Sequence, residues 1–314
     1  MARKVIIDAD PGIDDAMAIT LALFDPDLEV LALTAAAGNT GPAQATKNIQ
    51  TIVEQLDPPR WPRIGAAPED SALECDGRLL HGNNGLGNVE FPFAGLAKSH
   101  PSEKVLCDEV RAAPEEVTII CLGPLTNIAR AIQRDPEFVS LVGRLVISGG
   151  TLSVPGRVSP VADFNTFCDP LSARRVLKST ATKTLIPLDV SSELTFTFDL
   201  LDQLPSEHTG AGKFLRQILP FAFRAQRQAL AQEHINLHDI AALIAVTNPE
   251  LFETEMLAGD VETEGELTAG MVVFDRRKAS VRQWRANMEV ALKADTAALR
   301  DCVLRALARA GKAS

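Results

Sequence analysis

The segment VIIDADPGIDDAMAI, residues 5–19, decides the fold, because it joins an apolar, β-branched run to a helix-period run through a loop of carboxylates. Asp8, Asp10, Asp14 and Asp15 lie within eight residues, and apolar side chains flank them on both sides. A solvated acidic run normally has polar neighbours, since like charges repel and need water. Buried carboxylates instead need a metal ion or dense hydrogen bonding. The segment therefore predicts a strand, a polar site at its carboxyl end and a helix behind that site.

The same alternation of short apolar runs, loops and helix-period segments continues along the chain. It is typical of an α/β fold with an open, mostly parallel sheet flanked by helices. A stripe of apolar residues between 45 and 56 predicts an amphipathic helix, and the almost wholly apolar residues 16–24 predict a buried one. The expected strands are residues 5–7, 30–34, 117–121, 145–147 and 184–186.

The C-terminal part of the chain adds two expectations. Residues 255–275 alternate on either side of a glycine-containing turn, which predicts a small antiparallel excursion. The last segment is expected to be a helix with Asp295 or Thr296 as its N-cap and Gly311 as its end. No internal repeat or linker interrupts the chain, so we expect a single domain over residues 1–314.

Composition narrows the classes of partner. The formal net charge is −10 and no cluster of lysine and arginine is present, which argues against nucleic acid as a partner. No apolar run is long enough to span a membrane or to form the core of a signal peptide, which predicts a cytoplasmic protein without membrane contact. The five cysteines, at 75, 107, 121, 168 and 302, form no CxxC pair, so we expect reduced, buried thiols.

The acidic loop admits three interpretations from its residues alone. An EF-hand is excluded, because a strand precedes the loop and Gly12 is fifth from Asp8, where an EF-hand has glycine sixth, between two helices. A phosphotransferase with an aspartate nucleophile fits the strand and loop, but the loop lacks the basic and hydroxyl residues that bind phosphate. An all-oxygen site for a hard divalent cation meets no objection.

Other polar residues occur where further strands of the expected sheet should end. Each alone is a common turn or capping residue, but together they indicate one site. These residues are Asn39, Thr126, Asn127, Asp163, Asn165, His238 and Asp239.

The chain contains an ordered series of motifs through which it resembles the inosine-uridine preferring nucleoside hydrolase family, from residue 5 to about residue 275. The resemblance implies an open α/β sheet related to the Rossmann fold, a tightly bound Ca²⁺, and hydrolysis of ribonucleosides to base and ribose. It also implies a homodimer or homotetramer. The motifs, in chain order, are DADPGIDDAMAI at 8–19, GN at 38–39, HGNNGLG at 81–87, LGPLTNIA at 122–129, ISGG at 147–150, ADFNTFCDP at 162–170, PLDV at 187–190 and HD at 238–239.

The resemblance assigns the metal site. Asp10, Asp15, Asp239 and the backbone carbonyl of Thr126 would bind Ca²⁺, an oxygen-only set of the kind a hard cation prefers. The ion would hold the ribose 2′ and 3′ hydroxyls and a water, and Asp10 would be the general base on that water. Asp8 has no such role, and we expect it to support the loop by accepting backbone hydrogen bonds.

The resemblance also assigns the substrate contacts. His238 would be the acid that protonates the departing base, and His81 a contact on the base side. Nearby carboxylates would stabilise the positive charge that develops on the sugar. The residues expected to orient the ribose are Asp14, Asn39, Asp163 and Asn165.

The chain departs from the family pattern at four positions. Asp163 replaces the usual glutamate and is one methylene shorter, which puts the ribose contact in question. The other three are Ser148 in place of methionine, Asn84 in place of aspartate and Ile240 in place of proline.

The motifs determine the preferred base less well than the ribose contacts. The chain has no tyrosine, although related enzymes with broad base tolerance often place tyrosines over the base. The histidine pair favours a pyrimidine or mixed inosine-uridine preference over a purine-only site built on tryptophan, since neither Trp61 nor Trp284 lies next to His238. The side chains expected to line the base are Phe221, Phe223, Gln226 and Gln228.

Two other functions remain open at this point. The chain could keep the fold and cation as a nucleoside-binding or regulatory relative, because Asp163 and Ser148 alter the sugar side. Alternatively, the acidic loop could serve metal-dependent phosphate chemistry. The motifs lack basic residues, but Arg78 and Arg157 are close to them in sequence.

Overall fold

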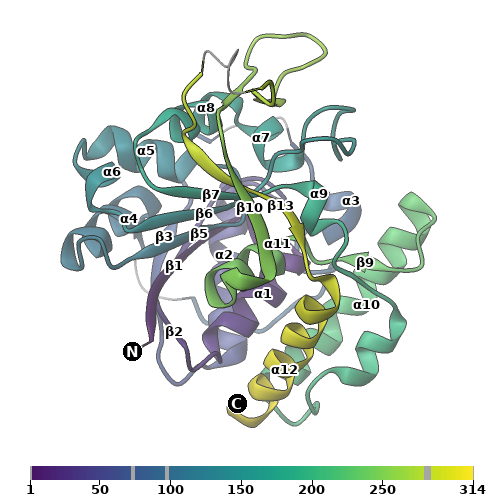
Figure 1. Cartoon of the computed structure of the whole chain (residues 1–314). Coiled ribbons are helices and arrows are strands. Elements are labelled where there is room, and N and C mark those ends of the chain that lie inside the picture. Colours follow the sequence, from purple (N-terminus) through teal and green to yellow (C-terminus); the bar gives the residue numbers. More distant parts are fainter. Residues whose placement is uncertain (1, 72–74, 96–98, 279–283, 314) are drawn as a thin grey trace.

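The computed structural model describes residues 2–71, 75–95, 99–278 and 284–313, and its centre is a twisted sheet of nine strands (Figure 1). The strands are parallel except at one edge, where β10 runs antiparallel to β13. In spatial order they are β10 (Phe252–Leu257), β13 (Met288–Ala294), β7 (Lys183–Ile186), β6 (Arg144–Ser148), β5 (Thr118–Cys121), β1 (Arg3–Ala9), β2 (Leu28–Ala35), β3 (Arg63–Ala66) and β4 (His100–Pro101).

Helices cover both faces of this sheet, and each face has its own apolar core. Side chains alternate along β1, so that Val5 and Ile7 enter one core and Ile6 the other. The first core packs against α1 (Ile13–Leu23), α2 (Pro42–Leu56), α10 (Gly210–Leu230), α11 (His238–Thr247) and α12 (Thr296–Ala313). The second packs against α4 (Ser102–Ala112), α5 (Thr126–Arg134), α6 (Phe138–Leu141) and α8 (Pro170–Lys178).

The remaining elements are short and connect the layers. Two-stranded antiparallel sheets join β11 to β12 and β8 to β9. These elements are α3 (Arg78–His81), α7 (Phe164–Cys168), α9 (Leu188–Ser191), β8 (Thr195–Phe196), β9 (Ile235–Asn236), β11 (Gly259–Val261), β12 (Val272–Phe274) and the 3₁₀ helices η1 (Phe198–Gln203) and η2 (Pro249–Leu251).

The expected fold class is confirmed, as are the five expected strands and the two expected N-terminal helices. The stripe on α2, which includes Ile49 and Val53, is buried, and α1 is buried along almost its whole length. The antiparallel excursion is the β11–β12 pair, with Gly259 opposite Phe274. Within the described ranges, no helix is both long and apolar enough to cross a bilayer.

The expected end of the last helix is wrong. The helix begins as expected after Asp295, whose carboxylate accepts the backbone N–H of Ala298 at 3.0 Å. It continues through Gly311, however, and ends at residue 313. A Cβ at Gly311 would lie 2.9 Å from the Pro205 side chain, so this glycine permits close packing and does not end the helix.

Candidate active site

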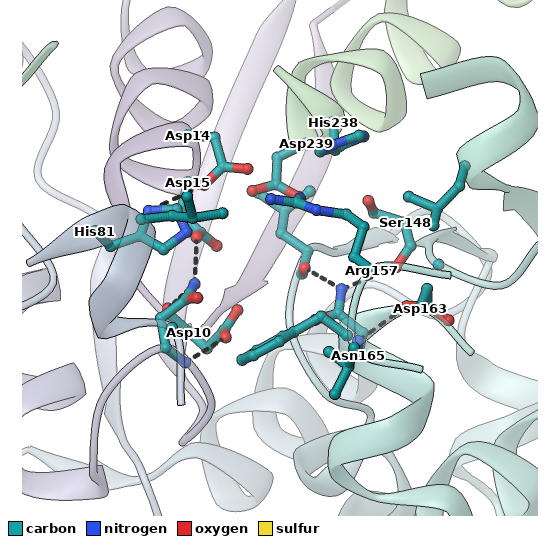
Figure 2. Close-up of a pocket in the computed structure, with 18 of the residues that line it drawn as sticks. Asp10, Asp14, Asp15, His81, Ser148, Arg157, Asp163, Asn165, His238 and Asp239 are labelled. Atoms are coloured by element: carbon teal, nitrogen blue, oxygen red, sulfur yellow. Dashed lines mark hydrogen bonds and ion pairs between the residues drawn. The ribbon is translucent and has the colours of Figure 1, made fainter. Parts of the chain in front are cut away.

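Polar side chains gather at the carboxyl ends of β1, β2, β5 and β6, around a cavity of about 390 Å³ (Figure 2). Asp10 directly follows β1, and Ser148 is the last residue of β6. The other lining side chains come from the amino ends of α1, α7 and α11, which converge on the same edge of the sheet. This is the edge at which open α/β sheets bind their ligands.

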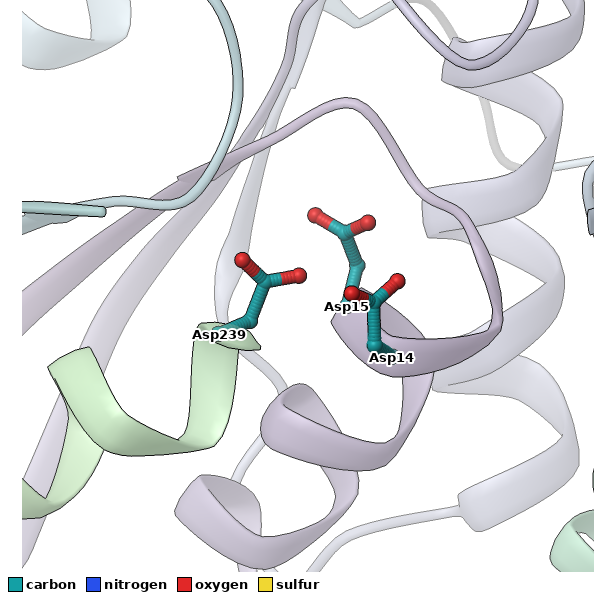
Figure 3. Close-up of side chains that lie close together, drawn as sticks. All are labelled: Asp14, Asp15 and Asp239. Atoms are coloured by element: carbon teal, nitrogen blue, oxygen red, sulfur yellow. The ribbon is translucent and has the colours of Figure 1, made fainter. Parts of the chain in front are cut away.

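Three carboxylates form the centre of the site (Figure 3). One oxygen from each of Asp14, Asp15 and Asp239 lies within 4.8 Å of the others, and this set is called the carboxylate cluster below. The first two come from the first turn of α1 and the third from the first turn of α11. Asp10 lines the same cavity but stands outside this set.

One buried carboxylate oxygen in this site has no hydrogen-bond partner among the described atoms. Asp15 Oδ2 accepts the Gly12 amide at 2.9 Å, whereas its Oδ1 is buried and has no partner among the described atoms. Burial, followed by repulsion from Asp14, raises the pKa of Asp15 to about 7. Burial and the neighbouring aspartates also raise the pKa values of Asp10 and Asp239. An unpartnered carboxylate oxygen among crowded carboxyls fits a hard divalent cation.

Asn39 connects Asp10 to Asp15. Its backbone N–H donates to Asp10 Oδ2 at 2.8 Å, and its side-chain amide donates to the Asp10 carbonyl at 3.0 Å and to Asp15 Oδ2 at 3.4 Å. Asn39 therefore aligns two of the expected metal ligands, in addition to lining the cavity where we expect the ribose.

Asp8 supports the site from beneath, but not in the way expected. Its Oδ1 accepts the Thr34 hydroxyl at 2.6 Å and the Asn127 side-chain amide at 2.8 Å, so the expected backbone hydrogen bonds are wrong. Asn127 also donates to the carbonyl of Ala35. Burial raises the pKa of Asp8 to about 7 against the effect of these two bonds. Asp8 thus joins β1 to β2 and α5 below the carboxylate loop.

His81 lies over the start of α1. Its Nδ1 accepts the Ile13 backbone N–H at 3.0 Å, which places the ring proton on Nε2. Burial lowers the pKa of His81, and the ring lies 3.7 Å from Asp14 Oδ1. A Cβ on Gly12 would come within 2.7 Å of this ring, so the glycine of the DPG turn allows His81 to approach.

His238 lies across the cavity at the first position of α11. Its Nδ1 is 3.0 Å from the Ser191 hydroxyl of α9, and the residue is buried. Burial and the charge of Arg157 lower the pKa of His238 to about 3. Both imidazoles are therefore neutral near pH 7.

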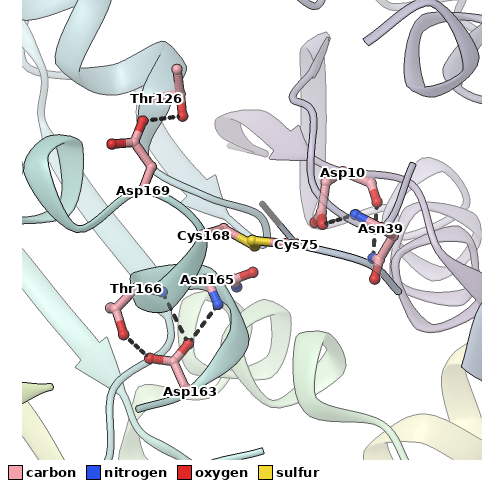
Figure 4. Close-up of a disulfide and its surroundings, with 9 residues drawn as sticks. All are labelled: Asp10, Asn39, Cys75, Thr126, Asp163, Asn165, Thr166, Cys168 and Asp169. Atoms are coloured by element: carbon pink, nitrogen blue, oxygen red, sulfur yellow. Dashed lines mark hydrogen bonds between the residues drawn. A yellow bond between two sulfur atoms is a disulfide. The ribbon is translucent and has the colours of Figure 1, made fainter. Parts of the chain in front are cut away.

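Asp163 is used as a helix cap. Its carboxylate accepts the amides of Gly150 at 2.6 Å, Asn165 at 2.9 Å and Thr166 at 3.4 Å, together with the Thr166 hydroxyl. The Asn165 side chain in turn donates to the carbonyls of Leu122 and Ser148 at 2.6 and 3.0 Å. Both expected ribose contacts therefore brace the ends of β5 and β6 against α7. Figure 4 shows the bonds from Asn165 and Thr166 to Asp163.

Comparison with known proteins identifies the family of this chain. The sequence profile of the inosine-uridine preferring nucleoside hydrolases matches residues 5–301. The chain belongs to this family. It is similar to a probable uridine nucleosidase 2 of Arabidopsis thaliana, with 33% identity over 95% of each chain.

Solved nucleoside hydrolases share the whole fold. A plant nucleoside hydrolase aligns with a TM-score of 0.90 at 30% identity, covering 98% of this chain and 99% of its own. A purine-preferring ribonucleoside hydrolase from Gardnerella vaginalis also aligns with a TM-score of 0.90, at 28% identity, covering 99% and 100%. The chain is therefore an N-glycosyl hydrolase of ribonucleosides, in a family of metal-dependent hydrolases.

Thr126, the expected carbonyl ligand of this nucleoside hydrolase, begins α5. Its hydroxyl donates to Asp169 Oδ2 at 2.6 Å, and Asp169 Oδ1 accepts the Ser172 amide to cap α8. Thr126 is not among the residues that line the cavity. The side-chain contacts of Thr126 therefore hold α5 to α8.

Apart from Arg157, the walls of the cavity include side chains that the sequence did not indicate. Leu79, Val158, Phe164 and Leu230 provide apolar surface, and Arg157 provides a charge. These residues lie in loops or at helix ends, where no periodicity marks them.

The expected aromatic and amide lining from α10 is wrong for this structure. Phe223 is buried and stacks on Phe198, with ring centroids 4.5 Å apart, and Gln226 also faces the core. Phe221 and Gln228 line a separate hollow on the surface. Only the last residue of α10, Leu230, reaches the cavity, because the preceding turns of the helix pack against other elements.

A disulfide joins two segments beside the nucleoside hydrolase cavity (Figure 4). It links Cys75 to Cys168, which are 93 positions apart in sequence and 5.4 Å apart between Cα atoms. The expectation of five reduced thiols is therefore wrong for this pair, whereas Cys107, Cys121 and Cys302 are free. Cys75 precedes the segment that carries His81, and Cys168 ends the helix that carries Asn165, so the bond ties together two sides of the site.

We expect Cys168→Ser to lower stability by about 2–4 kcal/mol, because the bond closes a long loop and restricts the unfolded chain. Thermal unfolding with and without dithiothreitol should show a lower Tm for reduced wild-type protein and no further effect of the reductant on Cys168→Ser. Cys302→Ser is the matched control and should keep the response to reductant. Free-thiol counts of five in the purified wild-type protein would contradict the bond.

Proposed function

We propose that the chain hydrolyses the N-glycosidic bond of ribonucleosides in a Ca²⁺-dependent reaction, with a pyrimidine or mixed inosine-uridine preference. The observation that carries this proposal is the carboxylate cluster, whose oxygens lie within 4.8 Å of one another on the cavity that also holds Asn39, Asn165 and two histidines. An oxygen-only set favours Ca²⁺ over softer metals.

The proposed metal ligands are Asp10, Asp15, Asp239 and the Thr126 carbonyl. A bound cation would supply a grip on the ribose 2′ and 3′ hydroxyls and would lower the pKa of a bound water. Asp10 is the proposed general base. Its Oδ2 accepts the Asn39 amide, so we assign the proton transfer to Oδ1.

The remaining residues would hold the sugar and the base. We propose that Asp14, Asn39, Asp163 and Asn165 position the ribose and that Asp14 also stabilises the positive charge that develops on it. His81 presents Nε2–H on the base side. His238 is the proposed acid, and the Ser191 hydroxyl, 3.0 Å from its Nδ1, orients the ring.

The base preference rests on the apolar walls and on the tryptophans. Trp61 and Trp284 are both exposed, and neither lines the cavity. Without a tryptophan in its lining, the cavity lacks the large ring surface that would favour stacking of a purine. The name of the Arabidopsis relative agrees with activity on uridine.

The test is release of reducing sugar from uridine, inosine and cytidine by purified protein in the presence of Ca²⁺. We expect turnover of uridine and a much lower rate with 2′-deoxyuridine, because that sugar lacks one of the two hydroxyls. If the protein turned over none of these ribonucleosides while Ca²⁺ was bound, the proposal would be contradicted.

A second function is favoured by one observation. The Asp163 carboxylate already accepts four hydrogen bonds from the protein, which compete with a ribose hydroxyl for its oxygens. A nucleoside-binding relative with weak or no activity would show this feature. Such a protein would bind uridine in calorimetry without releasing ribose.

The assembly and compartment remain predictions. We propose one domain that assembles as a homodimer or homotetramer, without nucleic acid or membrane partners, in the cytoplasm. Disulfides are uncommon in a reducing cytoplasm, so the redox state of Cys75 and Cys168 in protein from cell extracts bears directly on the compartment.

A further inference from the structure

The Cys75–Cys168 disulfide links two walls of the cavity (Figure 4). Cys75 begins residues 75–81, called the rim segment below, and five residues of this segment, His81 among them, line the cavity. Cys168 ends α7, whose Asn165 also lines the cavity. The bond therefore connects the part of the chain that presents His81 to the part that presents Asn165.

The α7 side of the bond is anchored to the sheet independently of the disulfide. The Asn165 side chain donates to the carbonyls of Leu122, just after β5, and Ser148, at the end of β6. The Asp163 carboxylate that caps α7 accepts the Gly150 amide at 2.6 Å. These bonds should keep α7 in place when the disulfide opens.

The rim segment depends on the disulfide for its tie to α7. Among the described residues, no hydrogen bond or ion pair joins these two segments. Gly77 instead packs on Asn39, so closely that a Cβ would lie 2.1 Å from the side-chain oxygen. His81 accepts the amide of Ile13 at the start of α1. Opening the disulfide would therefore let the rim segment move relative to α7.

The disulfide is open to attack from one side. Cys75 is partly exposed and lines a second hollow, of about 420 Å³, whereas Cys168 is buried. Thiol–disulfide exchange requires that a thiolate reach one of the two sulfurs, and exposed disulfides are the labile ones. Burial instead raises the pKa of Cys107 to about 11, which keeps that thiol protonated and unreactive. The Cys75–Cys168 pair is thus suited to redox exchange.

We propose that the Cys75–Cys168 pair is a reversible redox switch, and that a dithiol reductant lowers the affinity of the protein for ribonucleosides by opening it. This inference goes beyond the proposed function and rests on it for its readout. The oxidised form is the active one, because the cavity of about 390 Å³ has both walls in place when the bond is closed. A switch also suits the proposed cytoplasmic compartment, where disulfides are usually transient and redox-sensing.

The exchange needs one dithiol for each disulfide. A thiolate of the dithiol attacks Sγ of Cys75, the S–S bond breaks, and its electron pair leaves on Sγ of Cys168. The second thiol of the reductant then attacks the mixed disulfide and releases Cys75. Two electrons pass to the cysteine pair, and the two protons lost by the dithiol are taken up by the two cysteines. The reductant leaves as a disulfide.

The experiment treats wild-type protein with oxidised glutathione and then with dithiothreitol, below the Tm of the reduced protein. Thiols counted after unfolding should rise from three to five. We expect the KM for uridine to rise about tenfold on reduction, as it would if the freed rim segment kept its binding arrangement about a tenth of the time. The kcat should change little, because bound uridine selects that arrangement. Re-oxidation should restore the original KM.

Variants separate a local switch from general loosening. Cys75→Ser and Cys168→Ser should both show the high KM of the reduced protein and no response to dithiothreitol. Cys302→Ser is the matched control, because Cys302 is a free thiol of α12, and it should respond as wild-type protein does. Affinity for Ca²⁺ should not change on reduction, since the carboxylate cluster comes from α1 and α11. An equal loss of Ca²⁺ and uridine affinity would overturn the proposal.

Three further results would overturn the switch. If native protein kept three thiols in dithiothreitol, the bond would be a permanent cross-link. If the thiol count rose to five and the KM stayed the same, the bond would not act on the cavity. A lower KM in the reduced protein would mean that the oxidised form is not the active one.

Failure of the switch is distinguishable from failure of the proposed function. If neither form released ribose from uridine, the proposed hydrolysis would fail. Calorimetry with uridine would then decide the switch, since binding about tenfold weaker in the reduced form would support it and equal binding would overturn it. If neither form bound uridine, both the function and the switch would be rejected.

Discussion

Asp10→Asn should lower kcat on uridine by about 10³-fold, the size of effect expected when a general base is lost. The substitution keeps the shape of the side chain, and an amide oxygen can still accept the Asn39 N–H that binds Oδ2. Asparagine cannot take a proton from water, however, and it is a weaker ligand for a hard cation. The measurement is initial rates of reducing-sugar release over a range of Ca²⁺ concentrations, with uridine at saturation.

The control for Asp10→Asn is Asp27→Asn, which changes an exposed carboxylate at the opposite edge of the sheet, next to the start of β2. It should keep wild-type kcat. A variant at Asp10 that retained more than about a tenth of the activity would contradict its role as general base. A nucleoside-binding relative would instead lose uridine affinity on Asp10→Ala, with no activity in either protein.

Asp239→Asn should weaken Ca²⁺ binding by at least about 100-fold, because loss of an outer-shell partner alone typically costs 10–100-fold and Asp239 is a proposed direct ligand. The same variant should unfold at a higher Tm than wild-type protein when both are free of metal. The reason is electrostatic, since Asp239 is buried beside Asp14 and Asp15 and its ionisation brings like charges together.

Calorimetric titration with Ca²⁺ and thermal unfolding with and without a chelator test both effects of Asp239→Asn. Wild-type protein should gain stability with Ca²⁺, and the variant should gain little. Asp76→Asn is a second control at the cavity mouth, because Asp76 is exposed and paired with Arg78 at 2.7 Å. Unchanged Ca²⁺ affinity in Asp239→Asn would remove this residue from the metal site.

The sequence allowed most of the fold to be predicted, because parallel strands buried on both faces are continuous apolar runs. The strands β1 and β5 are of this kind. The short edge strands β3 and β4 have no such run, since Arg63 and His100 begin them and β4 has two residues. Their pairing depends on the neighbouring strand and not on their own composition.

The carboxylate cluster could be predicted in part, because Asp14 and Asp15 follow a strand in a loop with apolar flanks. The motif resemblance then added Asp239 from a distant segment. The capping role of Asp163 depends on three nearby amides, a geometry that only the folded chain reveals. The pairing of Cys75 with Cys168 likewise depends on tertiary contact, since no local spacing brings these residues together.

The anchoring of the β6–α7 loop by Asp189 has a consequence for how such a protein can diversify. No member of the carboxylate cluster lies in residues 149–162, yet this loop presents Arg157 and Val158 to the cavity. Because Asp189 binds main-chain amides, it holds the loop whatever side chains stand at positions 152–154. The side chains of this loop can thus be changed while its backbone stays anchored. Their redesign offers a route to new base specificities on an unchanged sugar-cleaving centre.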